Sequence, residues 1–468
     1  MLNNGVMLQS FSWYMPSDGE FYNHLKEMAE TFHHLGITGI WMPPAAKGTS
    51  QEDVGYGNYD YWDLGEFDQK GTIRTKYGTR KELEACIEAL QNVDIQVYAD
   101  MVFNHKGGAD EKENFQAILT NPENRLEDIS EPQEITGWTK FTFPNRKGKY
   151  SDFIWRSYHF TGVDYDEKTK NKGIYRILGD GKYWAKDGDG EKGNYDYLMA
   201  ADIDHRHPEV IEELEKVSDF MIDQMGYDGF RYDALKHISP DFIDHLSKYI
   251  LEKHPNFYFV GEYWRDDQGS IDYYLNQTDY KIDLFDVPLH YNFYEAGMNP
   301  DYDMRKIFQG SLVEEKPLFA VTFVDNHDTE EGQSLSSWVG DWFKEIAYGL
   351  ILLRKDGYPC LFMADYLGGF EEKLEKMLLA RKTYALGDQD DYFVSPSKIG
   401  WVRRGEHPLA VLISTGEDDQ EKMFVGLEEK GKIYQDLSGK REDVVIDEEG
   451  FGLFTVGERS ISYYGAKL

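Results

Sequence analysis

Short apolar runs alternate with amphipathic helical patterns along most of the chain, and this alternation constrains the fold more than any other feature. The helical pattern after the first run places apolar residues at steps of three and four from Phe21 to Leu35 and stops at Gly36. The runs that read as strands lie at 6–11, 37–42, 95–103, 229–233, 257–261, 282–287, 318–324 and 358–363. Eight strands alternating with helices predict an α/β fold, a (β/α)8 TIM barrel.

Helix boundary signals agree with this alternation. Thr79 and Glu82 form a capping-box pattern at the start of a helix that runs to Leu90. Pro208 opens another helix, which ends at Gly226. We therefore expect one helix before the third strand and another before the fourth.

Two parts of the chain break the alternation. Residues 104–206 are polar and irregular, and they are far too long for a loop between a strand and a helix. From 397 to 468 the pattern changes to short alternating strands separated by glycine and acidic turns. We expect an inserted domain at 104–206 and a C-terminal antiparallel β-sandwich at 397–468, which leaves 1–103 and 207–396 for the barrel.

The chain is strongly acidic, with 85 Asp and Glu against 50 Lys and Arg and a net charge of -35. Such a surface repels polyphosphates and anionic membranes, so we expect no nucleic acid and no membrane partner. Residues 1–6 lack a basic segment before a long apolar run, which favours a cytoplasmic location unless a signal peptide has been removed. Cys86 and Cys360 are expected to be core residues, and the protein a monomer.

Polar side chains follow several of the predicted barrel strands at the point where each strand ends. Since active sites of this barrel form at the carboxyl ends of the strands, these side chains should converge on one mouth. A single Asp at such a position is usually a helix cap or turn residue, but several acids at one mouth would repel each other without a substrate, cation or arginine. The polar strand-end residues are Asp100, Asn104, His105, Arg231, Asp233, Glu262, Asn326, His327 and Asp328.

Two of these carboxyl groups have surroundings that suit opposite roles. Asp233 lies two residues after Arg231, which favours its ionised form, whereas Glu262 lies between Gly261 and Tyr263, where apolar surroundings favour its protonated form. Cleavage of a glycoside with retention needs a carboxylate nucleophile and a carboxylic acid about 5 to 5.5 Å apart. Adjacent parallel strands can supply that pair.

The sequence resembles the α-amylase family of glycoside hydrolases, in particular the bacterial liquefying enzymes and their intracellular relatives. Four ordered motifs carry the resemblance, and it covers essentially the whole chain. The motifs are DMVFNH at 100–105, GFRYDALKH at 229–237, GEYW at 261–264 and FVDNHD at 323–328.

The resemblance implies that Asp233 attacks the anomeric carbon, Glu262 is the general acid and base, and Asp328 stabilises the transition state. It further implies contacts to the sugar, although a core or capping role stays open for Trp13 and Tyr56. The implied sugar-binding residues are Trp13, Tyr56, His105, Arg231, Lys236, His237 and His327.

The resemblance also implies a structural Ca²⁺ ion bound by Asn104, Asp196, Asp202 and the backbone carbonyl of His237, and such oxygen ligands suit Ca²⁺. The alternative is that Asp196 and Asp202 are solvated loop acids. Further metal sites of the liquefying enzymes use acids that are absent here, so we expect no multi-metal cluster although Asp204 is retained. Those acids are replaced by Thr161, Ala185 and Arg206.

The function implied is retaining endo-hydrolysis of α-1,4-glucosidic bonds in starch, glycogen or maltodextrins. Exo-action or transglycosylation stays open, because both depend on loop shape. A catalytically silent barrel that only binds its ligand is a further alternative, since a fold does not fix activity. A zinc hydrolase using His105, His327 and Asp328 is disfavoured, because no strand end carries a His-x-His pair.

Overall fold

The computed structural model describes residues 4–468, and its centre is a closed barrel of eight parallel strands in the order β1–β15–β14–β13–β12–β11–β3–β2. Every strand lies within its predicted range, so the barrel is confirmed. The strands are β1 (Met7–Gln9), β2 (Gly39–Trp41), β3 (Gln96–Met101), β11 (Gly229–Tyr232), β12 (Tyr258–Gly261), β13 (Asp283–Phe285), β14 (Ala320–Phe323) and β15 (Tyr358–Phe362).

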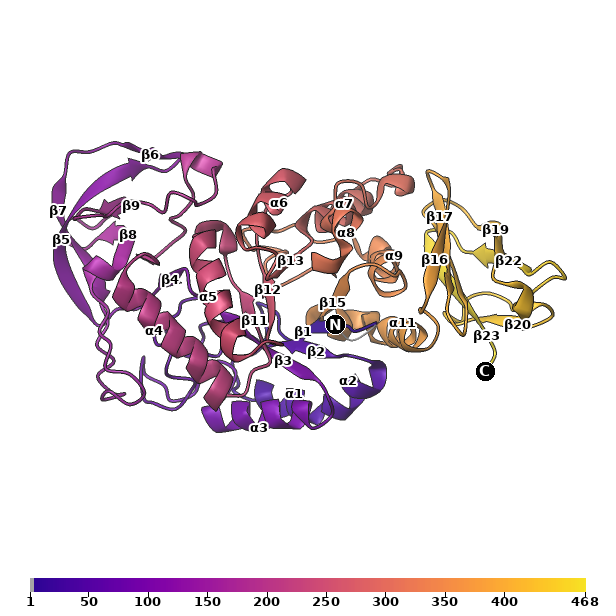
Figure 1. Cartoon of the computed structure of the whole chain (residues 1–468), viewed down its shortest axis with the longest axis horizontal. Helices are drawn as coiled ribbons and strands as arrows, with labels where there is room; N and C mark the ends of the chain where they lie inside the picture. The colour runs from indigo at the N-terminus through magenta and orange to yellow at the C-terminus, as the bar shows by residue number, and fades with distance from the viewer. Residues whose placement is uncertain (1–3) are drawn as a thin grey trace.

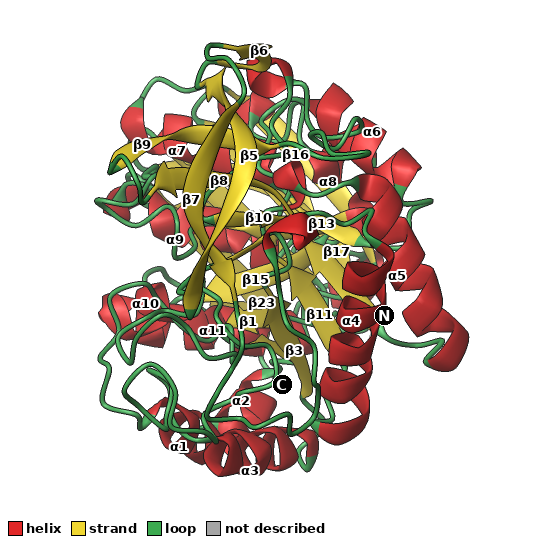
Figure 2. Ribbon diagram, turned by 90° about the vertical axis from the view of Figure 1, so that its left-hand side faces the viewer, coloured by secondary structure: helices red, strands yellow, loops and turns green. Residues whose placement is uncertain are grey.

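Helices surround the barrel strands (Figure 2). The predicted capping box at Thr79 and Glu82 is present, and Gly36 ends a helix with a φ of 89°. The apolar stripe from Phe21 to Leu35 forms two helices instead of one, because regular helical geometry is interrupted at Met28. The helices are α1 (Phe21–Glu27), α2 (Ala29–Leu35), α3 (Arg80–Gln91), α4 (Pro208–Asp219), α5 (Pro240–Lys253), α6 (Gln268–Gln277), α7 (Val287–Met298), α8 (Leu312–Glu315), α9 (Asp341–Leu352), α10 (Met363–Asp365) and α11 (Glu371–Thr383).

The segment between β3 and α4 forms an antiparallel sheet at one end of the long molecule (Figure 1). Its regular strands were not predicted, because polar residues on the exposed face of β5 hide the alternation of a half-buried strand. The strands are β4 (His105–Lys106), β5 (Glu111–Asn121), β6 (Asn124–Asp128), β7 (Gln133–Lys140), β8 (Phe160–Asp166), β9 (Asn171–Ile177) and β10 (Ala201–Ile203).

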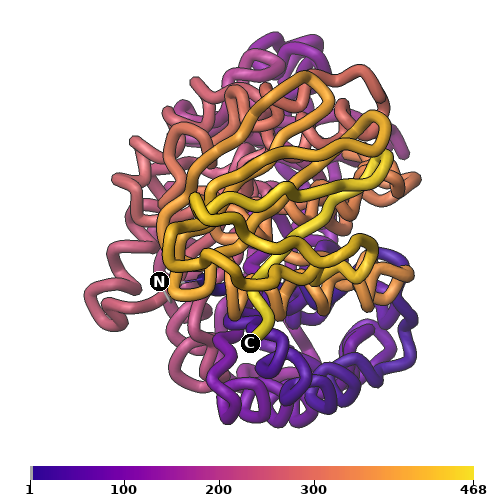
Figure 3. Tube along the Cα trace, turned by 90° about the vertical axis from the view of Figure 1, so that its right-hand side faces the viewer, coloured from indigo at the N-terminus to yellow at the C-terminus, as the bar shows by residue number. Residues whose placement is uncertain are grey.

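The C-terminal strands form a six-stranded and a two-stranded antiparallel sheet at the opposite end (Figures 1 and 3). Val411 packs with the core that includes the barrel, whereas its neighbour Leu412 packs between the two sheets, as the alternation of a strand requires. The larger sheet begins at Asp388, before the expected position 397. The strands are β16 (Asp388–Ser395), β17 (Lys398–Arg404), β18 (Leu409–Ser414), β19 (Asp419–Phe424), β20 (Ile433–Asp436), β21 (Val444–Val445), β22 (Phe451–Val456) and β23 (Ser460–Ala466).

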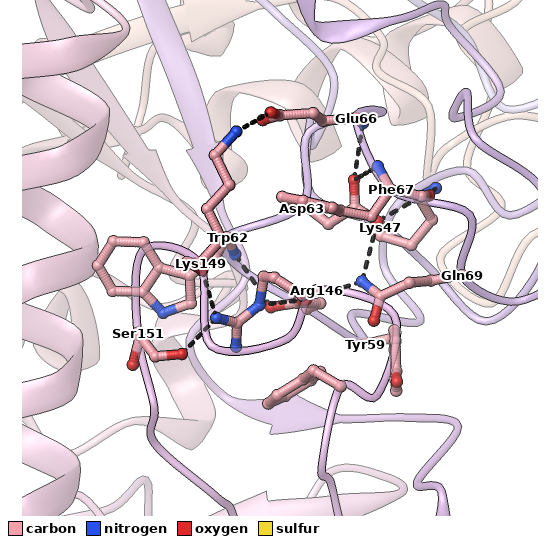
Figure 4. A network of polar contacts seen from close by, with 12 residues as sticks. Lys47, Tyr59, Trp62, Asp63, Glu66, Phe67, Gln69, Arg146, Lys149 and Ser151 are labelled. Carbon is pink, nitrogen blue, oxygen red and sulfur yellow. Dashed lines mark hydrogen bonds and ion pairs between the residues drawn. The ribbon is translucent and has the colours of Figure 1, made fainter.

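A buried polar network fastens the loop after β2 to the segment that follows β7 (Figure 4). Arg146 Nε lies 2.9 Å from Asp60 Oδ2, and Lys47 Nζ lies 3.2 Å from Asp63 Oδ2. The Gln69 side-chain amide donates to both carboxylates, at 2.9 and 3.0 Å. Because each charge has a partner, these groups can remain inside the protein.

Cys86 and Cys360 are both buried and free, as expected. None of the helices within residues 4–468 combines the length and the apolar character that crossing a membrane requires. Residues 1–3, on which the expectation about a leader sequence partly depends, lie outside the described residues.

Candidate active site

One arginine joins the acidic residues that follow two adjacent barrel strands. Strands β11 and β12 pair in parallel, with Tyr232 opposite Gly261, so the residues that follow them leave the barrel side by side. Arg231 Nη1 donates to Asp233 Oδ1 and Arg231 Nη2 to Glu262 Oε2, both at 2.7 Å. The two carboxyl groups predicted to act together therefore share one guanidinium.

Arg231 is fully buried, with 0% of its side chain exposed. Its Nη1 also lies 3.0 Å from Oδ1 of Asp100, at the end of β3. The Asp100 carboxylate accepts further hydrogen bonds from Trp41 Nε1 at 2.9 Å and from the Tyr56 hydroxyl at 2.8 Å. Arg231 thus donates hydrogen bonds to three carboxyl groups, and its positive charge offsets their mutual repulsion. Acids that converge at the strand ends need such a cation.

The surroundings of Glu262 favour its protonated form. Burial raises the pKa of the Glu262 carboxyl well above its usual range, and the charges of Asp233 and Asp328 act in the same direction, although Arg231 opposes them. Burial, followed by the charge of Asp233, also raises the pKa of Asp328 to about 7. A neutral carboxylic acid at Glu262 can donate a proton at the pH of most cells.

His327 is buried beside Asp328 and its tautomer follows from its contacts. The Gln9 side-chain amide Nε2 lies 2.9 Å from His327 Nδ1, so Nδ1 accepts and Nε2 carries the proton. That Nε2 lies 3.4 Å from Asp328 Oδ2. Burial and the nearby charge of Arg231 lower the pKa of His327 well below its usual value, so the ring is neutral.

Trp13, Tyr56 and His327 form a wall of parallel rings. The ring centroids of Trp13 and Tyr56 are 6.1 Å apart with an interplanar angle of 1°, and those of Tyr56 and His327 are 5.0 Å apart at 5°. The Trp13 backbone N–H donates to Glu330 Oε2 at 2.8 Å, which ties the loop after β1 to the loop after β14. Flat aromatic faces of this kind can pack against the apolar faces of sugar rings.

The remaining predicted sugar-binding residues lie on the loops after β3 and β11. His105 Nε2 donates to the Tyr56 carbonyl at 2.7 Å, and its Nδ1 lies 3.2 Å from Asn104 Nδ2. His237 Nδ1 lies 2.6 Å from the Tyr195 carbonyl, and Lys236 forms an ion pair with Glu191. The loop after β11 therefore contacts the segment that precedes β10.

The four predicted calcium ligands come from three segments that meet beside β4. Asp202 pairs with His105 in the register of β10 and β4, and the Ile203 N–H donates to the Asn104 carbonyl at 3.0 Å. The hydrogen bond between His237 and Tyr195 brings the loop after β11 next to Asp196. Long-range pairing thus brings these residues to one corner of the molecule.

The donor atoms at this corner fit a hard cation. Asn104 Oδ1 and Asp202 Oδ1 are buried and have no hydrogen-bond partner among residues 4–468, a costly situation unless another group binds them. Burial raises the pKa of Asp196 to about 7, and burial together with the charge of Asp196 raises the pKa of Asp202. Two buried carboxyl groups that repel each other are the arrangement that a Ca²⁺ ion would stabilise.

Asp204 is paired by the chain's own cations. Lys182 Nζ lies 2.7 Å from its Oδ2 and Arg206 Nε lies 2.8 Å from its Oδ1. Burial raises the pKa of this carboxyl, but Arg206 and Lys182 outweigh it and hold the pKa below its usual value. Both carboxylate oxygens are engaged, so Asp204 has little to offer a second cation.

His159, His207 and Glu209 are close enough for one ion, with ligand atoms within 4.8 Å of one another, but none is a predicted ligand. His159 Nδ1 accepts the Arg156 N–H at 3.1 Å, so Nε2 carries the proton and donates to Glu209 at 3.0 Å. Within the described residues, His105, His327 and Asp328 form no comparable group.

Some residues of the site were not identified from the sequence. Gln9 fixes the tautomer of His327, Trp41 holds Asp100, and Glu330 anchors Trp13. Gln9 and Trp41 are the last residues of β1 and β2, so the strand-end criterion could have found them. Glu330 lies in a loop and carries no such signal.

Comparisons with known proteins agree with this geometry. Residues 25–377 match the family model "Alpha amylase, catalytic domain". The chain is 46% identical to an alpha-amylase of Bacillus licheniformis, over 98% of this chain and 93% of that protein. It is 40% identical to the cytoplasmic alpha-amylase of Escherichia coli (strain K12), over 99% of this chain and 99% of that protein. It is also 46% identical to a glucan 1,4-alpha-maltohexaosidase of Bacillus sp. (strain 707), over 98% of this chain and 92% of that protein.

Among solved structures, an Anoxybacillus alpha-amylase superimposes with a TM-score of 0.66 at 17% identity, covering 99% of this chain and 96% of that one. At that identity the likeness concerns the fold alone, and it includes the sheets at both ends of the barrel. With the catalytic-domain match and relatives at 40–46% identity over nearly the whole length, this chain belongs to the α-amylase family.

Proposed function

We propose that the protein is an α-amylase that hydrolyses internal α-1,4-glucosidic bonds of starch, glycogen or maltodextrins with retention at the anomeric carbon. The observation that carries this proposal is the shared guanidinium of Arg231, which holds Asp233 and Glu262 at 2.7 Å each at the ends of adjacent strands. Burial favours the protonated form of Glu262, and Asp233 on the same guanidinium supplies the second carboxyl group, so the pair supports the two roles that a retaining mechanism needs.

In the first step, the Asp233 carboxylate attacks the anomeric carbon and forms a glycosyl ester, while the bond to the leaving oxygen breaks. The Glu262 proton moves to that oxygen. In the second step, the Glu262 carboxylate takes a proton from water, whose oxygen attacks the anomeric carbon and releases Asp233. Asp328, close to Arg231 and His327, stabilises the positive charge that develops on the sugar ring.

The sugar at the cleaved bond contacts groups that are already fixed by the protein. Trp13 and Tyr56 supply flat surfaces, the neutral ring of His327 supplies an N–H donor at Nε2, and His105 lies against the backbone carbonyl of Tyr56. Arg231 holds the carboxyl groups of Asp233 and Glu262 in place through its hydrogen bonds. Lys236 and His237, which contact the segment before β10, face the leaving-group side.

We assign the corner formed by Asn104, Asp196, Asp202 and the carbonyl of His237 to one structural Ca²⁺ ion. The support is the pair of buried unpartnered oxygens on Asn104 and Asp202 and the mutual repulsion of Asp196 and Asp202. The ion would supply positive charge that joins 104–206 to the barrel. We divide the chain into a barrel at 1–103 and 207–396, an inserted domain at 104–206 and a C-terminal domain at 397–468, whose larger sheet also includes β16 (Asp388–Ser395).

We further propose that the enzyme is a cytoplasmic monomer whose partner is the α-glucan, and that it binds neither nucleic acid nor membranes. The net charge of -35 and the relative from Escherichia coli, whose name includes "cytoplasmic", support this proposal. Activity in the cell extract and not in the medium is the expected result. Light scattering should give the mass of one chain.

A time course of product formation on amylose tests the activity. Endo-hydrolysis predicts mixed oligosaccharides from the first minutes and α-configured products by NMR before mutarotation. A second candidate has support from the Bacillus sp. relative named a glucan 1,4-alpha-maltohexaosidase. A single product of six glucosyl units from the outset would favour that exo-type action, and β-configured products would refute a retaining mechanism.

A further inference from the structure

The loop that follows β12 is held by a carboxylate from a distant part of the chain. The Tyr263 hydroxyl donates to Asp189 Oδ2 at 2.6 Å, and Arg265 Nη1 lies 3.1 Å from Asp189 Oδ1. The backbone N–H of Glu191 donates to the same Oδ1 at 2.8 Å. Asp189 therefore has three donors, two of them on the barrel loop.

The Asp189 carboxylate is buried, so the loss of these contacts would destabilise it. Only 3% of its side chain is exposed, whereas Arg265 is 26% exposed. A carboxylate removed from water in this way is costly unless its donors stay in place, so the contacts restrain both segments.

The same segment is also fixed to the loop after β11. The Ser239 hydroxyl donates to Asp187 Oδ2 at 2.5 Å, and Lys236 forms an ion pair with Glu191. Residues 187–191 thus bridge the loops that follow β11 and β12. Those strands end next to Asp233 and Glu262.

Tyr263 connects this bridge to the proton donor. It follows Glu262 directly in the chain, and its ring packs on Tyr274, with centroids 4.6 Å apart at 29°. The backbone of Glu262 is itself held, since its N–H donates to the Tyr232 carbonyl at 3.0 Å and its carbonyl accepts from the Leu235 N–H at 2.9 Å. With the phenol also fixed, the turn that orients the Glu262 side chain has little freedom.

We propose that Asp189 is a positioning residue that, through Tyr263 and Arg265, holds Glu262 in the orientation needed to protonate the leaving oxygen. This inference rests on the proposed role of Glu262 as general acid. Misplacing a reacting group by about 1 Å can reduce a rate by roughly 100-fold. Loss of Asp189 should therefore affect substrates in proportion to their need for that proton.

The test compares two substrates in the full-length protein. Maltoheptaose has a sugar leaving group that needs full protonation, whereas 2-chloro-4-nitrophenyl maltotrioside releases an acidic phenol that can leave with little help. Asp189→Ala should lower kcat/KM on maltoheptaose by about 10- to 100-fold and change kcat/KM on the aryl substrate by less than about 3-fold, because kcat/KM covers only the steps up to the glycosyl ester, in which Glu262 acts as the acid. Equal losses on both substrates, or no loss on maltoheptaose, would overturn the proposal.

Related variants should follow the contacts. Tyr263→Phe should show the same substrate dependence, and adding it to Asp189→Ala should cost little more, because both remove one linkage. Asp189→Asn keeps an oxygen for the Tyr263 hydroxyl and should recover part of the rate. Asp180→Ala is the matched control, since Asp180 lies exposed in the same segment. Additive losses, or a similar loss in the control, would contradict a specific linkage.

Two measurements separate this proposal from folding and from the proposed function. If Asp189→Ala does not fold, as judged by its melting curve, Tyr263→Phe carries the test, because it removes one hydroxyl only. Amide hydrogen exchange at 262–265 should be faster in either variant than in the wild type and unchanged in the control. Wild-type protein inactive on both substrates would refute the proposed function, and exchange unchanged in Tyr263→Phe would refute the linkage itself.

Discussion

Replacing Arg146 with Met tests whether the buried network of Figure 4 fixes the inserted segment to the barrel. The Arg146 and Asp60 side chains are 1% and 0% exposed, and their charged atoms are 2.9 Å apart. Methionine keeps an apolar chain of similar length against Phe143, but among residues 4–468 it leaves the Asp60 carboxylate with only Gln69 and the Trp62 N–H as donors. The variant therefore removes one charge from a buried pair and also the hydrogen bonds from Arg146 Nη1 to the carbonyls of Lys149 and Ser151, which add a cost that does not depend on pH.

Breaking a buried ion pair lowers the free energy of unfolding by about 3 to 5 kcal/mol. Because the Asp60 carboxylate keeps other donors, we expect a loss of about 3 kcal/mol in this case. Burial raises the pKa of Asp60, while Arg146 lowers it, so the variant should raise that pKa further. A carboxyl whose folded pKa exceeds its unfolded value lowers stability increasingly as the pH rises from about 4 to the folded pKa, and above the folded pKa the full cost remains. The deficit should thus be larger at pH 7.5 than at pH 5.

Equilibrium urea unfolding, followed by tryptophan fluorescence at both pH values, measures this deficit. The matched control is Lys149→Met, because Lys149 pairs with Glu66 at the surface and is 51% exposed, so its loss should leave the unfolding midpoint nearly unchanged. Asp60→Asn combined with Arg146→Met should recover part of the loss. A deficit that is independent of pH, or one equal in the control, would refute the reasoning.

The remaining predictions concern catalysis, calcium and pH. Asp233→Asn and Glu262→Gln should each lower starch hydrolysis by about 10³-fold or more without lowering the melting temperature, and near-normal rates in either would reject the assignment. Calcium at about 100 times its Kd should add about 2.7 kcal/mol of stability, and Asp202→Asn should abolish that gain; loss of activity on chelation in still-folded protein, reversed by calcium, would instead indicate a catalytic metal. Burial lowers the pKa of His290 to about 4, so its neutral ring contributes stability that is lost as the pH falls from about 6.5 to about 4. His290→Asn should reduce the slope of stability against pH in that window by about 1.4 kcal/mol per unit, and an unchanged slope would contradict the linkage.

The barrel could be predicted from the sequence because its signals are local. Each parallel strand is buried on both faces, so it appears as a continuous apolar run, and all eight strands lie inside the predicted ranges. The capping box at Thr79 and the left-handed Gly36 depend only on neighbouring residues. The polar residues after the strands made Asp233 and Glu262 candidates for the same reason, and the structure places them after adjacent strands.

Other features depended on contacts between residues far apart in the chain. The strands of the inserted sheet are half exposed and polar, and β5 pairs with β9, which is not its neighbour in the chain. The start of the C-terminal sheet at Asp388 is a local exception, because β16 is polar but forms a hairpin with the next strand, β17. Arg231 compensates acids from three strand ends, and pairing of β4 with β10 brings Asp202 beside Asn104.

The sequence by itself determined the order of the strands and the type of chemistry, because periodicity and strand-end position are properties of short segments. Only the tertiary structure decided which donors Asp189 meets, since Tyr263 and Arg265 are more than seventy residues away along the chain. Whether these side chains meet depends on how the loops pack against each other in three dimensions. No local sequence pattern encodes that packing.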